Sequence, residues 1–113
     1  MEKYFEKRPW GSFERLCCDE KCTVKIIMVN PNSELSLQYH LKRDEFWKVL
    51  DGEAEFVVGG QRLFGRKGDE FFIPREMKHQ VITRDSSVRF LEISFGDFDE
   101  NDIVRLKDRY GRV

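Results

Sequence analysis

Short apolar runs separated by turn residues dominate the chain, and little of it shows the spacing of an amphipathic helix. Residues 22–29 (CTVKIIMV) are rich in β-branched side chains, and residues 34–40 alternate between polar and apolar positions. Both patterns predict strands, because β-branched residues and a period of two suit a pleated sheet. Further strands are predicted at residues 45–50, 53–58, 61–64, 70–73, 79–83 and 88–95.

Turn signals fall between these runs at short intervals. Residues 30–33 combine Asn and Pro, Asp51-Gly52 is a tight-turn signal, and Gly59-Gly60 is a two-residue hairpin signature. Many short strands joined by regular turns favour a sandwich or a barrel. We therefore expect an all-β fold of a single domain.

The last part of the chain departs from this pattern. Asp99 could cap a short helix that carries the apolar residues of segment 103–106 and stops at Gly111. An extended tail lying on the barrel fits the same residues. The expected organisation is one domain, 1–113, with an N-terminal arm and first strand at 1–21, a barrel core at 22–96 and a C-terminal tail at 97–113.

Composition supports the β prediction and excludes some partners. The 113 residues include ten Phe, three Tyr and two Trp, and aromatic side chains favour sheets. The formal net charge is −1, from 20 basic and 21 acidic residues. This balance provides no basic field for nucleic acid or for an anionic membrane surface, so we expect neither partner.

The location of the protein is predicted from what the chain contains. No apolar stretch is long enough to cross a bilayer, and residues 1–8 carry alternating charges rather than an apolar signal core. Cys17, Cys18 and Cys22 are an odd number without the CxxC spacing typical of metal-binding cysteines. We interpret them as reduced residues on or beside an early strand, and we expect a cytoplasmic protein.

Side chains with metal-ligating atoms recur on the predicted strands. Gln38 and His40 are two apart and share one face of a strand, Glu45 opens the next strand, and His79 opens a later one. Two imidazoles, a carboxylate and an amide oxygen suit a transition-type divalent ion. The single carboxylate would leave a net positive site, which attracts an anionic or hydroxyl-bearing ligand.

The spacing of these ligands resembles that of the cupin superfamily. Segment 32–52 is similar to the first cupin motif, and Gly68, Pro74 and His79 are similar to the second. Two departures stand out, because Gln38 replaces the usual first His and Glu76 replaces the usual Gly of the second motif. Gln at the first ligand position is a feature that resembles the phosphomannose isomerases.

Other segments resemble the type II phosphomannose isomerase domain, which forms the C-terminal part of bifunctional enzymes that also make GDP-mannose. The resemblance covers nearly the whole chain, from Arg8 to Arg112. No Gly-rich loop that would cradle phosphates precedes a helix, so guanylyltransferase activity is not expected. The similar segments are RPWGSF at 8–13, QYH at 38–40, RDEFW at 43–47, DIVR at 102–105 and YGR at 110–112.

The resemblance implies a single-domain cupin, which is a double-stranded β-helix or jelly-roll barrel, with one metal ion. It implies reversible isomerisation of mannose 6-phosphate to fructose 6-phosphate, with Lewis-acid stabilisation of an enediol oxyanion. Zinc is the first choice of metal, and manganese, nickel, cobalt and iron also accept this ligand set. The implied ligands are Gln38, His40, Glu45 and His79.

Roles for the remaining polar residues are less constrained by the sequence. Lys48, Glu92 and a metal-bound water are candidates for the proton-transferring base, and nothing in the sequence selects among them. Arg43 and Arg112 are expected to contact phosphate, because a guanidinium fork binds phosphate oxygens bidentately.

The sequence also leads to expectations about partners and alternative functions. A homodimer is expected, because cupins commonly pair and open sheet edges must be covered, and Trp10 is expected to pack the arm against this barrel or a partner's. One alternative is a non-catalytic metal-containing cupin that binds a sugar phosphate or nucleotide sugar. Others are a cupin enzyme acting on another small molecule and a metal-stabilised subunit that pairs with a nucleotidyltransferase.

Overall fold

The computed structural model describes residues 1–112, which form ten strands joined by turns and loops. None of the described residues forms a helix that is long and apolar enough to cross a membrane. The strands are β1 Tyr4–Arg8, β2 Gly11–Arg15, β3 Cys22–Val29, β4 Leu37–Tyr39, β5 Asp44–Val58, β6 Gln61–Arg66, β7 Glu70–Ile73, β8 His79–Ile82, β9 Val88–Phe95 and β10 Val104–Lys107.

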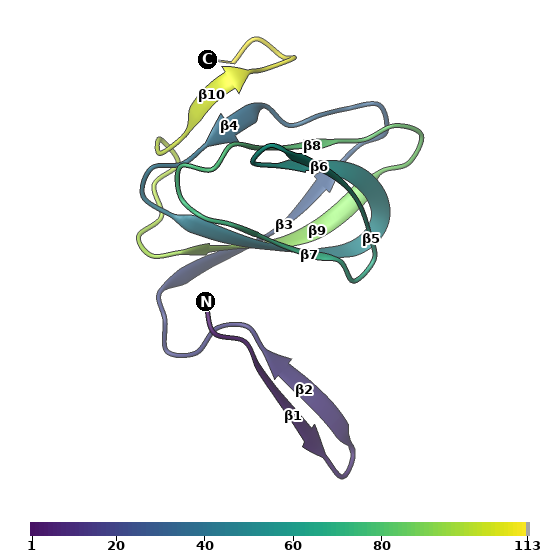
Figure 1. Cartoon of the computed structure of the whole chain (residues 1–113), viewed down its shortest axis with the longest axis vertical. Coiled ribbons are helices and arrows are strands. Elements are labelled where there is room, and N and C mark those ends of the chain that lie inside the picture. Colours follow the sequence, from purple (N-terminus) through teal and green to yellow (C-terminus); the bar gives the residue numbers. More distant parts are fainter. Residues whose placement is uncertain (113) are drawn as a thin grey trace.

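Eight of these strands form a barrel whose two sides share β5 (Figure 1). The first half of β5 pairs with β7 and β9, and β9 pairs in turn with β3. The second half of β5 pairs with β6 and β8, and β4 and β10 follow beyond β8. All of these pairs are antiparallel, as expected for a chain of short strands joined by tight turns.

The tight turn predicted at Asp51-Gly52 is wrong, because β5 runs through this position without a break. Its register against β9 shifts between Val49 and Asp51, where the strand passes from one side of the barrel to the other. Gly52 has φ +74°, and a Cβ at this residue would lie 2.0 Å from the carbonyl oxygen of Ser87. Asp51 and Gly52, residues typical of a turn, therefore lie where β5 bends at a corner of the barrel.

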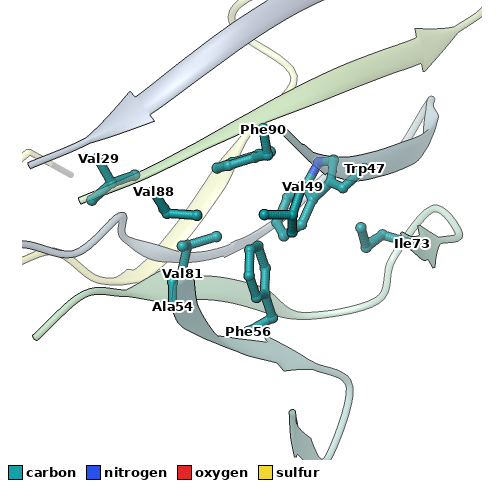
Figure 2. Close-up of a cluster of buried hydrophobic side chains, with 9 residues drawn as sticks. All are labelled: Val29, Trp47, Val49, Ala54, Phe56, Ile73, Val81, Val88 and Phe90. Atoms are coloured by element: carbon teal, nitrogen blue, oxygen red, sulfur yellow. The ribbon is translucent and has the colours of Figure 1, made fainter. Parts of the chain in front are cut away.

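The hydrophobic core fills the space between the two sides of the barrel (Figure 2). The ring of Phe56 stacks on Phe71 at a centroid distance of 4.6 Å, and Trp47 packs against Phe90 at 5.0 Å. Trp47 and Phe56 lie on β5, Phe71 on β7 and Phe90 on β9, so both sides of the barrel contribute to this core. The buried members of the core are Val29, Trp47, Val49, Ala54, Phe56, Ile73, Val81, Val88 and Phe90.

The short C-terminal helix predicted after Asp99 is also wrong. The residues form turns and then β10, which pairs with β4, so the tail lies on the barrel as an added strand. The carboxylate of Asp102 accepts hydrogen bonds from the backbone N–H groups of Leu41 and Lys42, at 2.9 and 3.0 Å. These contacts, distant in sequence, outweigh the weak local helix signal.

The N-terminal arm is a hairpin of β1 and β2 that extends away from the barrel (Figure 1). Trp10 lies at its turn and is 73% exposed, so it does not pack against the barrel of this chain. The segment after β2 returns to the barrel, where Cys17 and Cys22 pack beside a second apolar cluster around Phe46. The three cysteines are free thiols.

Candidate metal centre

Strand pairing brings the predicted ligands together from three parts of the chain. Gln38 in β4 lies directly opposite His79 at the start of β8, so their side chains stand on the same face. His40 follows β4 immediately, and Glu45 lies at the start of β5. His40, Glu45 and His79 therefore lie close together in the barrel interior, and Gln38 lies across from His79.

The carboxylate of Glu45 lies between the imidazoles of His40 and His79. Its Oε2 is 3.5 Å from His40 Nε2, and its Oε1 is 3.7 Å from His79 Nε2. The ligand atoms of these three residues all lie within 4.8 Å of one another, and each residue is at most 2% exposed. A metal ion at this position would be shielded from bulk water.

Backbone carbonyls orient both histidines. His40 Nδ1 lies 2.6 Å from the carbonyl oxygen of Asp102, and His79 Nδ1 lies 2.9 Å from that of Met77. A carbonyl can only accept, so each Nδ1 carries the proton and each Nε2 keeps a lone pair. This is the arrangement by which outer contacts prepare histidine for a metal ion.

Buried atoms without hydrogen-bond partners point to the same use. Glu45 Oε1 and His79 Nε2 are buried and have no partner among the described residues. Burying such acceptors is costly unless something satisfies them. A divalent cation would satisfy both, so the donor set fits a metal ion.

Electrostatics also favour the deprotonated imidazoles that a metal requires. Burial lowers the pKa of His40 and lowers the pKa of His79 to about 4. Both rings are thus neutral at pH 7, and metal binding does not have to displace a proton from either of them.

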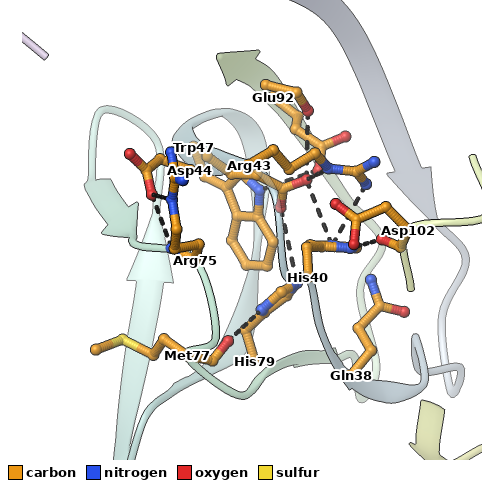
Figure 3. A network of polar contacts seen from close by, with 12 residues as sticks. Gln38, His40, Arg43, Asp44, Trp47, Arg75, Met77, His79, Glu92 and Asp102 are labelled. Atoms are coloured by element: carbon orange, nitrogen blue, oxygen red, sulfur yellow. Dashed lines mark hydrogen bonds and ion pairs between the residues drawn. The ribbon is translucent and has the colours of Figure 1, made fainter. Parts of the chain in front are cut away.

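The two departures from the cupin motifs have distinct structural settings. Gln38 stands beside His40 (Figure 3). Its Oε1 accepts a hydrogen bond of 2.5 Å from the Ser36 hydroxyl. Glu76 has φ +71°, a left-handed conformation that explains why glycine suits this position. The Glu76 N–H donates to the His40 carbonyl at 2.6 Å, which ties the loop to a proposed ligand.

Arg43 lies against the cluster rather than on a free loop. It is 7% exposed, its Nε donates to Glu45 Oε2 at 3.0 Å, and its Nη2 lies 3.4 Å from His40 Nε2. The guanidinium also lies over the Phe98 ring, 4.7 Å from the centroid. It lines the cavity described below and offsets the negative charge of Glu45.

The two candidate bases lie on opposite faces of the sheet. Lys48 ion-pairs with Glu14 and Glu70 on the outer face, which removes it as a candidate. Glu92 faces the cluster and accepts a hydrogen bond of 3.4 Å from the Trp47 indole N–H. Burial, followed by the proximity of Glu45, raises the pKa of Glu92 to about 7.

A cavity of about 260 Å³ opens beside the cluster and contains several cationic side chains. The residues that line it include Gln38, Arg43, Glu92 and Arg112. Arg112 forms a two-contact ion pair with Asp108, at 2.9 and 3.1 Å.

Sequence reasoning missed two further cations of this cavity, Lys25 on β3 and Arg105 on β10. Alternation along VRLK at 104–107 was an available signal for a strand, but its partner strand was not visible.

Comparisons with known proteins agree with the fold. A family model described as "Mannose-6-phosphate isomerase C-terminal" matches residues 2–108. Xanthan biosynthesis protein XanB of Xanthomonas campestris and mannose-1-phosphate guanylyltransferase ManC of Salmonella typhimurium are 35% and 33% identical over 108 residues. Each alignment covers 94% of this chain but only 23% and 22% of the relative, so the chain spans about a quarter of their length.

A solved structure supports the barrel assignment. A sugar phosphate isomerase of the cupin superfamily from Silicibacter pomeroyi superimposes with a TM-score of 0.61 and 20% identity, over 80% of this chain and 69% of that one. At this identity the likeness shows the fold alone, and that fold is the all-β cupin barrel expected from the sequence.

Proposed function

The chain belongs to the mannose-6-phosphate isomerase C-terminal family, and on this basis we propose that it is a metal-dependent isomerase of mannose 6-phosphate and fructose 6-phosphate. The observation that carries the proposal is the buried cluster of His40, Glu45 and His79 with both Nε2 lone pairs directed inward. Gln38 is the proposed fourth ligand, because it lies opposite His79 and lines the cavity.

The reaction moves a proton between C1 and C2 of an open-chain sugar through an enediol. A bound divalent ion supplies Lewis-acid stabilisation of the developing oxyanion. Zinc is our first choice, and manganese, nickel, cobalt and iron also suit two nitrogen and two oxygen ligands. The cavity beside the cluster, about 260 Å³ in volume, is where the sugar would bind.

Glu92 is the proposed proton carrier. A general base acts best when its pKa lies near the working pH, and burial places the pKa of Glu92 at about 7. The carboxyl group lines the cavity and is held by the Trp47 indole N–H. It can therefore accept the proton from one carbon and return it to the neighbouring carbon.

Arg43 would bind the oxygen that becomes negative. One Nε2 lone pair cannot serve both a metal ion and an N–H donor, so metal binding at His40 would release the Arg43 Nη2 contact. The Nε bond to Glu45 and an Nη1 bond of 3.2 Å to the Asp99 carbonyl would keep the guanidinium in place. The freed N–H then becomes available to a substrate oxygen.

We also propose that the protein is a homodimer. The outer face of β3 exposes Val24, Ile26 and Met28 at 54, 58 and 62%, and the arm exposes Phe5 and Trp10 at 58 and 73%. An isolated two-stranded hairpin is marginal in water, and β3 is an edge strand. A second copy that lays its arm across β3 would cover both apolar surfaces.

The proposed activity can be tested by incubating metal-loaded protein with mannose 6-phosphate in deuterated water. NMR should show fructose 6-phosphate with deuterium entering at C1, because the carried proton exchanges with solvent. Chelator-treated protein and His79→Ala should show neither signal. Binding of mannose 6-phosphate without turnover would instead indicate the non-catalytic binding module.

A further inference from the structure

Arg105 on β10 is a half-buried cation with one buried N–H group that the fold leaves without a partner. Its Nε is buried and has no hydrogen-bond partner among the described residues, although its strand pairs with β4. A guanidinium N–H that loses water without gaining an acceptor is unfavourable. The position therefore suits an acceptor that arrives with a ligand.

Strand pairing directs Arg105 into the cavity. Arg105 lies opposite Gln38 in the β10–β4 register, so the two side chains stand on one face as neighbours. Both line the cavity beside the metal centre. An anionic group held by Arg105 would thus lie one side chain away from a proposed metal ligand.

Lys25 approaches the same cavity from the opposite wall. It is the cross-strand partner of Glu92 in the β3–β9 register, and its Nζ lies over the Phe98 ring, 4.4 Å from the centroid. Lys25 has no carboxylate within ion-pair distance among the described ion pairs. Its charge is available to a ligand between β3 and β10.

The two arginines expected from the sequence to bind phosphate are already engaged. Arg43 donates to Glu45 and to the Asp99 carbonyl, and Arg112 is paired through two contacts with Asp108. Asp108 compensates the charge of Arg112, and hydrogen bonds from Arg112 lower the pKa of Asp108 to about 2. Arg105 is the cavity arginine whose N–H groups remain unused among the described hydrogen bonds.

We propose that Arg105 and Lys25 form a subsite for a phosphomonoester dianion, with Arg105 as the direct ligand and Lys25 as the second cation. The planar fork of Arg105 matches two phosphate oxygens. The metal centre then holds the reacting end of the sugar, and this subsite holds the phosphorylated end. The inference rests on the proposed function for the identity of the sugar alone, since any phosphomonoester could occupy the subsite.

The test measures binding rather than turnover. Metal-loaded protein is titrated with mannose 6-phosphate, unphosphorylated mannose and inorganic phosphate by isothermal calorimetry, for the original chain and for Arg105→Met. Methionine keeps the apolar stem, so packing on β10 is retained. Arg89→Met is the matched control, because Arg89 is an exposed arginine on β9 and its loss removes the same charge. Thermal melting and metal content verify that each variant folds.

Arg105→Met should weaken mannose 6-phosphate binding on the order of 10- to 100-fold, the size of a lost charge-assisted contact. Arg105→Lys should give an intermediate loss, while Arg89→Met and mannose binding should be unchanged. Equal losses in Arg105→Met and Arg89→Met, or no phosphate-dependent binding by the original chain, would overturn the subsite. Phosphate binding that needs Arg105 but comes without isomerisation would keep the subsite and reject the isomerase. Isomerisation with an unchanged KM in Arg105→Met would keep the isomerase and reject the subsite.

Discussion

Replacing Glu92 by Gln should make the metal-free protein more stable at alkaline pH. The substitution keeps the hydrogen bond to Trp47 and the packing around it. Gln has nearly the same shape, and its amide oxygen can still accept from the Trp47 indole N–H. What disappears is a carboxylate that is 7% exposed and close to Glu45. The substitution therefore isolates the effect of one buried charge.

The sign follows from the pKa of Glu92, which is raised from 4.5 to about 7 in the folded protein. Between these values the folded state binds more protons than the unfolded state, so the stability of the original chain falls as pH rises. Each pKa unit corresponds to about 1.4 kcal/mol, which gives a loss of about 3 kcal/mol above pH 7. Glu92→Gln escapes this loss and should match the original chain near pH 4.5.

Urea unfolding of chelator-treated protein at pH 4.5 and pH 8 measures this difference. With a slope of about 1.5 kcal/mol per molar urea, the midpoint at pH 8 should rise by about 2 M in the variant. Glu53→Gln, at an exposed position of β5, should show no such pH-dependent gain. A gain that is equal at both pH values, or a destabilised variant at pH 8, would refute the electrostatic reasoning. Restoring metal should shrink the gain, because the cation stabilises the carboxylate.

Three further perturbations test other parts of the structure. His79→Ala should abolish metal uptake and the metal-dependent rise in melting temperature. For the original chain, bound metal should add about 2.7 kcal/mol to the free energy of unfolding at metal concentrations near 100 times Kd. An unchanged metal content in the variant would reject the ligand assignment. Gly52→Ala should destabilise the barrel by about 2 to 5 kcal/mol in urea unfolding, because φ is +74° and the new Cβ would collide with Ser87; a loss below about 1 kcal/mol would contradict the corner. Trp10→Ser should shift the mass measured by light scattering from two chains towards one, and a single-chain mass for the original protein would reject the dimer.

Much of the fold was predictable because local pattern and final structure agree. The strands at 22–29, 70–73 and 88–95 have the bounds expected from β-branched runs and turn residues. The corner at Asp51-Gly52 was misinterpreted, because the same residues favour a hairpin turn and a bend within a strand that joins two sheets. To distinguish a hairpin turn from such a bend, one must know that β5 pairs with four other strands. The residues around Gly52 do not reveal that pairing.

The candidate site also has residues that the sequence could place and one that it could not. Spacing alone placed Gln38 and His40 on one face, and the cluster of His40, Glu45 and His79 does form. Alternation along β5 could also have excluded Lys48, since Glu45 and Trp47 occupy the opposite face. Arg105 could not have been found in this way, because its place in the cavity depends on the pairing of β10 with β4.

If the metal centre performs isomerisation, turnover must depend on bound metal. The most direct measurement is a titration of chelator-treated protein with zinc or manganese while conversion of mannose 6-phosphate to fructose 6-phosphate is recorded. Without metal we expect no turnover, and with added metal we expect a linear rise that levels off at one equivalent per chain, since one cluster of His40, Glu45 and His79 is present in the described residues. Full turnover without metal, or none after one equivalent has bound, would contradict this expectation.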